Sequence, residues 1–233
     1  MNRPRQLGFT LWELLVTVLV AGVLFGIGVP NFMEFQRNSG MSAASNDLVT
    51  ALLTARTEAV KRQAPVTVCL SANPNAPNPV CLPNPVADAG LPPAPNPAVG
   101  YVVWVDENDN FNADGTRNLL DATDGNAVID AGELVLTRVA PPGGTIRVSA
   151  TCGYVSYTPT GVTRRVPGLC FPPPIRAVLF CDDRGRRVAA GSLSSARVVS
   201  IDLPGRGTVR QDVADVTGLI TGDLAGVNPT CPP

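Results

Sequence analysis

The sequence predicts an α+β fold in which a long N-terminal helix, half transmembrane and half amphipathic, is followed by an antiparallel β-sheet head. Three observations support this fold class: an apolar stretch at residues 9–29, a helical period over residues 31–63, and short β-branched segments separated by Gly, Pro and Asn in residues 64–233. One helix against one antiparallel sheet domain is the simplest arrangement of these elements.

The amino-acid composition excludes several classes of function. The chain of 233 residues carries 18 Lys+Arg, 19 Asp+Glu and no histidine, for a net charge of -1. Without an imidazole, a Ser/His/Asp triad, a Cys/His pair and a His-ligated metal are all excluded. With 23 Pro and 22 Gly, the chain is also unsuited to a helical bundle. We therefore expect that the protein is not an enzyme and that it acts in assembly or binding.

The N-terminal segment has the features of a membrane anchor. Residues 1–8 form a basic leader, and the apolar stretch behind it is long enough to span a bilayer. Because basic residues precede this stretch, the N-terminus is expected in the cytoplasm and the chain beyond Pro30 on the other side of the membrane.

Glu13 is the one charged residue inside this stretch. A carboxylate there costs roughly 2.5 kcal/mol or more without a partner, so it indicates a function. A free N-terminal amine, created by cleavage between Gly8 and Phe9 in the same or a neighbouring helix, would neutralise it. The alternative is that Glu13 lies close enough to the interface to stay hydrated. The first interpretation predicts self-assembly of helices.

Residues 8–16 read GFTLWELLV and resemble the type IV prepilin signature. The resemblance implies that a prepilin peptidase removes residues 1–8 after Gly8 and methylates Phe9. It places Glu13 and the helix-kinking Pro30 in a transmembrane and assembly helix at residues 9–30. It also implies an inner-membrane protein with a periplasmic head, and other pilins as its partners in a filament.

The helical period continues beyond Pro30 to a predicted end near Gln63, just before Pro65. Apolar residues recur there at mostly three- and four-residue steps: Phe35, Met41, Ala44, Leu48, Leu52, Ala55 and Ala59. Residues 31–63 are therefore expected to pack on the head as an amphipathic helix. Pro30 and residues 38–40 are its weak points.

The head is predicted to be rich in strands. The expected strands are Val66–Leu70, Tyr101–Asp106, Glu133–Val139, Thr145–Ala150, Tyr154–Thr158, Arg176–Asp182, Ala196–Ile201 and Thr208–Gln211. Nine prolines make residues 72–98 an extended surface loop. The tail, residues 211–233, carries no clear period.

Six cysteines follow the membrane stretch, and an even number in an exported domain indicates disulfides. Six cysteines allow 15 pairings. Among these we favour three: Cys69 with Cys81, Cys152 with Cys170, and Cys181 with Cys231.

The head is divided by charge. Residues 88–133 hold nine acids and one arginine. Within them Asn110, Asn112, Asp114 and Asp121 approximate the spacing of a calcium loop, although Asn, Asp and Gly are also ordinary turn residues. This makes calcium a candidate ligand, and no other cofactor is expected.

Residues 138–210 hold eleven arginines and three acids. The candidates for contacting DNA phosphates are Arg186, Arg187, Arg206 and Arg210. The alternative is that these arginines pair with the acidic segment or remain solvated.

The head also resembles the GspH/FimT (FimU) family of minor pseudopilins. The resemblance rests on residues 101–106 with 130–136, on 155–161, on 176–181, and on the closing segment 196–210. It implies a non-enzymatic subunit of a type II secretion pseudopilus or a type IV pilus, at or near the filament tip. In FimT-like members a Gly-Arg-x-Arg element is linked to DNA capture. Here Gly205-Arg206 matches the start of that element, and its second arginine is displaced to Arg210. The alternatives are therefore a DNA-binding minor pilin for natural transformation, and a membrane-anchored calcium-binding or adhesive domain.

Overall fold

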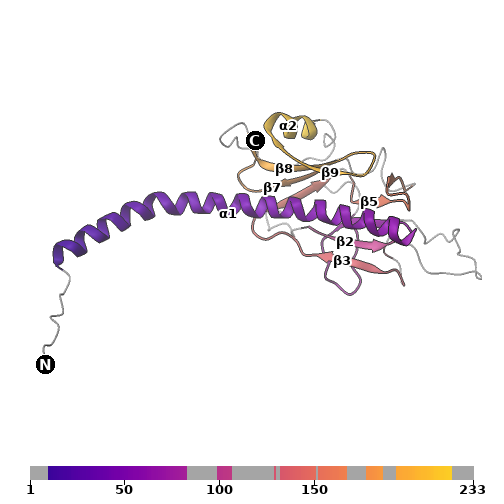
Figure 1. Ribbon diagram of the computed structural model, residues 1–233, viewed down its shortest axis with the longest axis horizontal. Helices are drawn as coiled ribbons and strands as arrows, with labels where there is room; N and C mark the ends of the chain where they lie inside the picture. Colours follow the sequence, from indigo (N-terminus) through magenta and orange to yellow (C-terminus); the bar gives the residue numbers. More distant parts are fainter. Residues whose placement is uncertain are drawn as a thin grey trace, which may run out of the picture. The chain divides into compact units, whose positions relative to one another are not determined.

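The computed structural model describes residues 10–82, 99–106, 129, 132–150, 152–166, 177–185 and 193–221. Within these ranges the chain forms two helices and nine strands (Figure 1). It divides into two compact units, residues 1–39 and residues 40–233, each described by itself. The division falls within residues 38–40, the segment that the sequence marks as a weak point of the helix.

Helix α1, Leu11–Arg62, passes through Pro30 without a break. Its buried residues begin only in the second unit and keep the predicted steps: Met41, Ala44, Ser45, Leu48, Ala51, Leu52, Ala55 and Ala59. Phe35 was predicted to join this stripe and does not, because it lies in the first unit, where the described chain is all helix, and is 68% exposed. The helix ends where Gln63 takes a left-handed conformation (φ 54°) just before Pro65.

The strands form two antiparallel sheets, which confirms the predicted fold class. The first has the order β3-β2-β1-β5-β6, with β1 Val66–Ser71, β2 Gly100–Val105, β3 Val135–Val139, β5 Tyr154–Tyr157 and β6 Thr163–Arg164. The second has the order β4-β7-β8-β9, with β4 Arg147–Ala150, β7 Ala177–Cys181, β8 Leu193–Ile201 and β9 Gly207–Asp212. Each predicted strand is present, and the two-residue strand β6 was too short to show a period.

Strand β1 lies at the centre of the first sheet and is buried along its whole length. Val66 pairs with Val105 on one side and with Tyr157 on the other. Because side chains alternate along a strand, Val66, Val68 and Leu70 share one face, and Thr67, Cys69 and Ser71 share the other. Residues of α1, β1, β2, β4, β5, β7 and β8 form one hydrophobic core.

Helix α2, Val213–Thr221, covers the outer face of the second sheet. Its Val216 packs with Leu179 and Val198, whereas Phe180 and Val199 belong to the core that contains α1. Figure 1 accordingly shows α2 and the C-terminal part of α1 on opposite sides of β7 and β8. The helix starts with a cap, in which the Ala214 N–H donates to Oδ1 of Asp212 at 2.9 Å. The tail, for which the sequence showed no clear period, therefore completes β9 at Asp212 and then forms a helix.

Candidate functional site

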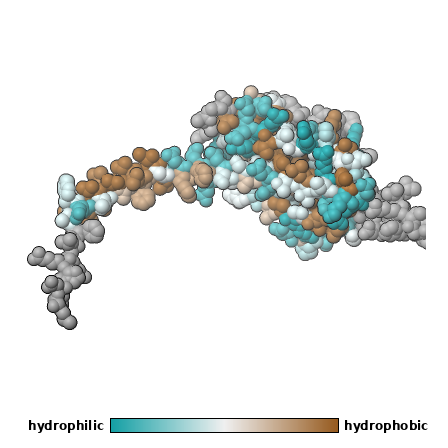
Figure 2. Space-filling view, in the orientation of Figure 1, coloured by the Kyte–Doolittle hydropathy of each residue, from teal (hydrophilic) through white to brown (hydrophobic). Residues whose placement is uncertain are grey.

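The first part of α1 presents apolar side chains on every side. The large apolar residues between Leu11 and Phe35 are 43–78% exposed, and Figure 2 shows much of this part of the helix in brown. In the described part of the chain, α1 is the one helix long and apolar enough to cross a membrane, with a mean hydropathy of 2.2 in its apolar window. Apolar surface of this extent is rare on soluble monomers, so this segment needs lipid or other helices around it.

Glu13 closes a hydrogen-bonded cap at the start of α1. Its carboxylate Oε2 accepts from the Thr10 backbone N–H at 2.9 Å and from the Thr10 hydroxyl at 3.0 Å, and the Glu13 N–H donates to Thr10 Oγ1 at 3.3 Å. This reciprocal arrangement is a capping box, and the Thr-x-x-Glu spacing could have revealed it in the sequence. Gly8 and Phe9, the predicted cleavage site, lie outside the described residues.

Pro30 lies inside α1 and cannot donate to the carbonyl four residues before it. The carbonyl that lacks this donor is that of Gly26, whereas the Asn31 side chain donates through Nδ2 to the next carbonyl, that of Ile27, at 3.2 Å. The Asn31 amide is therefore satisfied within the helix, but it does not replace the donor that Pro30 lacks.

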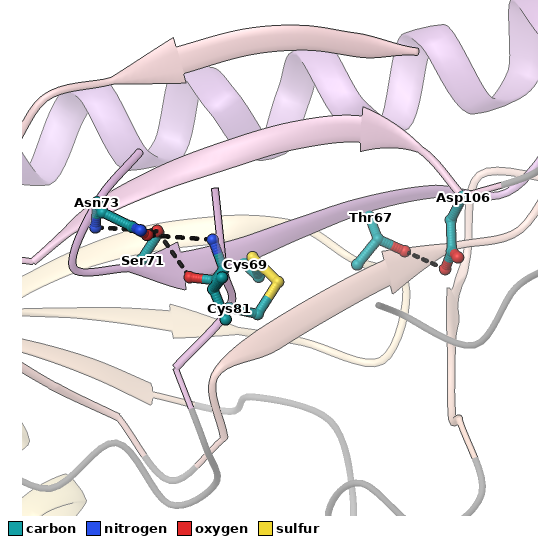
Figure 3. The surroundings of a disulfide bond; sticks show 7 residues. Thr67, Cys69, Ser71, Asn73, Cys81 and Asp106 are labelled. Carbon is teal, nitrogen blue, oxygen red and sulfur yellow. Dashed lines mark hydrogen bonds between the residues drawn. A yellow bond between two sulfur atoms is a disulfide. The ribbon is translucent and has the colours of Figure 1, made fainter. Parts of the chain in front are cut away.

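In the head, four polar side chains far apart in sequence form a closed ring on the face of the first sheet that carries Thr67. Arg164 donates through Nη2 to Asp106 Oδ2 at 2.9 Å and through Nε to Ser156 Oγ at 2.7 Å. Thr67 Oγ1 lies 2.7 Å from Asp106 Oδ2, a contact visible in Figure 3, and 2.8 Å from Ser156 Oγ.

A single hydroxyl proton cannot serve both of these Thr67 contacts. Thr67 therefore donates to Asp106, and Ser156 donates to Thr67, so that each member of the ring has a partner. Asp106, Thr67 and Ser156 are completely buried. The sequence singled out none of these four for this contact, because they lie on four different strands or strand ends.

The disulfide between Cys69 and Cys81 is present, as predicted (Figure 3). It closes a turn in which Asn73 Oδ1 accepts from the Val80 N–H at 3.1 Å and from the Ser71 hydroxyl at 3.1 Å. The described part of the Pro-rich loop, residues 72–82, is an irregular segment of hydrogen-bonded turns with no helix or regular strand, as a surface loop was expected to be. Cys152 and Cys181 are also disulfide-bonded. Their proposed partners, Cys170 and Cys231, lie outside the described residues.

The Gly205-Arg206 element is fixed to the first sheet by Tyr157. The buried phenol of Tyr157 donates to the Gly205 carbonyl at 2.9 Å. Gly205 has φ +84°, and a Cβ placed on it would lie 2.5 Å from the Tyr157 ring. Thr163 Oγ1 adds a bond of 2.8 Å to the Leu203 carbonyl. Gly205 is therefore required for packing against Tyr157, whether or not Arg206 binds a ligand.

The two described DNA-binding candidates each have an acidic partner. Arg206 lies 3.5 Å from Asp202, and Arg210 lies 3.5 Å from Asp215 on α2; both arginine side chains are at least half exposed. A phosphate group of DNA would have to displace these carboxylates from the arginines. DNA binding therefore stays a prediction. A gel shift that compares the intact chain with its Arg206→Ala and Arg210→Ala variants would test it. Arg186 and Arg187 lie outside the described residues.

The calcium candidates Asn110, Asn112, Asp114 and Asp121 also lie outside the described residues, so the calcium loop stays a prediction. Among the residues that are described, no group of three or more Cys, Asp or Glu side chains is placed to hold a metal ion.

Substituting Gly205 by alanine is expected to lower the free energy of unfolding by roughly 3 kcal/mol, because a left-handed alanine costs about 1–2 kcal/mol and the added methyl group displaces the Tyr157 ring. Gly144 is a matched control, since its φ is +77° and no atom lies within 4 Å of a Cβ added there. Gly144→Ala should therefore cost only roughly 1 kcal/mol. Denaturant unfolding of both variants measures the difference, and equal costs would contradict the packing role of Gly205.

Comparison with known proteins identifies a family. The family described as "Type II transport protein GspH" matches residues 44–205, which is more than half of the chain. The type IV major pilin protein PilA of Myxococcus xanthus (strain DK1622) is 47% identical over 53 residues. That match covers 23% of this chain and 24% of the relative, so the chain spans about a quarter of the length of that curated protein.

Two crystal forms of the type IV minor pilin FimU of Pseudomonas aeruginosa (strain PAO1) are similar at low identity. One has a TM-score of 0.38 at 15% identity over 76% of this chain and 92% of FimU. The other has a TM-score of 0.34 at 16% identity over 72% of this chain and 91% of FimU. On the family match over residues 44–205, the chain belongs to the GspH family of type II pseudopilins, which are structural subunits and not enzymes.

Proposed function

We propose that this chain is a minor subunit of a pseudopilus or type IV pilus that is processed after Gly8, waits in the inner membrane and enters the filament through α1. In this proposal residues 1–8 are the leader, residues 9–30 the membrane and assembly helix, and residues 31–63 the amphipathic helix of the head. Residues 64–233 form the periplasmic head, which is placed at or near the filament tip.

The observation that carries the proposal is the exposed apolar surface of α1 between Leu11 and Phe35, together with the single charge near its start. Glu13 is the one ionisable residue between Leu11 and Met33. A helix that is apolar on all sides can be surrounded by lipid before assembly and by similar helices after it. The same surface therefore suits both states of a filament subunit.

The orientation follows from charge. Arg3 and Arg5 precede the apolar stretch, and a cytoplasmic N-terminus leaves the head and its cysteines in the periplasm. The disulfide between Cys69 and Cys81 supports this, because disulfides persist in oxidising compartments such as the bacterial periplasm.

The test is to express the full chain in a host with a prepilin peptidase and a filament machinery, and to measure its mass in membranes and in sheared filaments. We expect a chain that begins at Phe9 with one added methyl group and is found with other pilins in the sheared fraction. A chain that begins at Met1, or one cleaved within residues 21–30 and released from the membrane, would contradict the proposal.

A further inference from the structure

The second half of α1 carries a second apolar strip beside its buried face. Val49, Leu53, Arg56 and Val60 follow one another at steps of four, three and four residues. At about 100° per residue, these steps keep the four side chains within a strip about 60° wide on the helix surface. We call these four residues the α1 ridge.

The ridge borders the buried face of α1 on one side only. A Cβ placed on Gly207 would lie 2.9 Å from the buried Leu52 and 3.6 Å from Val49 of the ridge. Outside the ridge, the positions of α1 from Asn46 to Arg62 that are not buried are all polar: Asn46, Asp47, Thr50, Thr54, Thr57, Glu58, Lys61 and Arg62. Apolar residues therefore extend beyond the part of α1 that the head covers, but only along this ridge.

Two turns of the head lie beside the ridge and widen its apolar surface. A Cβ placed on Gly161, between β5 and β6, would lie 3.0 Å from Val60 and 3.3 Å from Arg56 Nε. Val162 follows in the same turn, and Leu203 accepts a hydrogen bond from β6 through its carbonyl. The large apolar side chains of this surface are 43–69% exposed: Leu53, Val60, Val162 and Leu203. Exposed apolar side chains gathered from separate elements mark a surface that another molecule covers.

Arg56, in the middle of the ridge, indicates the charge of that molecule. It is partly buried, and in the part of the chain that the structure describes it is the one arginine without a hydrogen bond or an ion pair. The other described arginines all have partners: Arg37, Arg62, Arg138, Arg147, Arg164, Arg165, Arg184, Arg197, Arg206 and Arg210. A partly desolvated guanidinium without a carboxylate favours an acidic partner, because the two groups form charge-assisted hydrogen bonds.

We propose that the α1 ridge, together with Val162 and Leu203, receives an α-helix of a neighbouring filament subunit, and that this helix carries an Asp or Glu opposite Arg56. Steps of three and four residues are those at which two helices interdigitate their side chains, and a polar residue within such a seam fixes the register. An anionic membrane suits the surface less well, because lipid head groups attract clusters of basic residues and the ridge has one. Only the source of the helix, a filament subunit, rests on the proposed function.

The test replaces Leu53 by the photo-crosslinking amino acid p-benzoylphenylalanine in the full chain, in a host with a prepilin peptidase and a filament machinery. Illumination should join the chain to another pilin subunit, and mass spectrometry should find the attachment in a helix that contains an Asp or Glu. The same amino acid in place of Asp47, on the polar side of α1, is the matched control and should give severalfold less adduct.

Charge variants then test the role of Arg56. Arg56→Glu should lower the yield of the adduct about tenfold, a difference of about 1.4 kcal/mol, because a like charge would face the carboxylate of the partner. Arg56→Lys keeps the charge and should retain most of the adduct. Lys61→Glu reverses a cation that lies off the ridge and pairs with Glu58, so it should leave the yield unchanged. Thermal unfolding checks that each head stays folded.

The adduct is measured in membranes as well as in sheared filaments, so the surface is tested even in a chain that never enters filaments. Absence from filaments would contradict the proposed function and not the surface. Equal adduct from positions 53 and 47, attachment to lipid or outside a helix, or an unchanged yield in folded Arg56→Glu would overturn the inference.

Discussion

Replacing Glu13 by alanine is expected to leave membrane insertion and cleavage intact and to remove the chain from filaments. Glu13 lies within an apolar surface that either lipid or neighbouring helices must cover. There its carboxylate needs a cation, and the amine of a neighbouring chain cleaved before Phe9 is the group that the proposed processing creates. Loss of a buried ion pair costs about 3 kcal/mol or more, which corresponds to roughly a 100-fold loss of association.

The measurement compares the amount of the chain in sheared filaments with the amount in membranes, while mass spectrometry confirms removal of residues 1–8. Normal recovery of Glu13→Ala in filaments would contradict this role. A defect in cleavage would also contradict it, because Glu13 is proposed to act after processing.

Two further variants separate the charge of Glu13 from its part in the helix cap. Glu13→Gln keeps an oxygen that can accept from Thr10 but has no charge, so it should assemble as poorly as Glu13→Ala. Thr10→Val removes one of the hydrogen bonds to the carboxylate and keeps its charge, so it should assemble nearly as well as the unaltered chain. The opposite ranking would show that Glu13 serves the cap of its own helix and not a neighbour.

Replacing Asp106 by alanine is expected to lower the free energy of unfolding by about 3 kcal/mol. The substitution leaves Thr67 without its acceptor and Arg164 without its counter-ion inside the polar ring. Removing one member of a buried pair costs about 3–5 kcal/mol, and the lower end applies because Arg164 is 23% exposed. For a chain of this size the melting temperature should fall by roughly 6–12 °C.

Asp202→Ala is the matched control for this variant. Asp202 is also an aspartate paired with an arginine, but it is 42% exposed and lies 3.5 Å from Arg206. Exposed pairs contribute about 0–1 kcal/mol, and the hydrogen bond that Asp202 Oδ1 accepts from the Arg206 N–H at 2.6 Å adds about 1 kcal/mol, so the melting temperature should fall less than in Asp106→Ala. Circular dichroism melts of both variants in nanodiscs provide the comparison. Equal decreases in melting temperature would show that burial of the polar ring adds nothing to the stability that it contributes.

Local patterns in the sequence predicted most of the elements. The steps of buried residues in α1, the β-branched segments and the Gly and Pro turns all depend on residues close together in the chain. The disulfide between Cys69 and Cys81 could be predicted for the same reason, since only twelve positions separate its cysteines. Phe35 was misplaced because a helical period does not tell which turns have a partner to pack against.

Charge counting by segment was less informative about the head. It contrasted an acidic and a basic stretch, and the structure does pair Asp106 of the first with Arg164 of the second. Arg184 and Arg206, however, pair with Asp182 and Asp202 a few residues away. Counting charges could not distinguish these cases, because short-range pairing depends on turn geometry and long-range pairing on the order of the strands.

By itself, the sequence determined the apolar helix with its single carboxylate, the strand-rich head, the first disulfide and the resemblance to a pseudopilin family. The order of strands, the cover of the second sheet by α2, the ring around Asp106 and the turns beside the α1 ridge were decided only by the tertiary structure. The two contacts of Thr67 in the ring join residues 39 and 89 positions apart. Period and turn chemistry act over a few residues, whereas such contacts exist only after the whole chain has adopted one arrangement of its sheets.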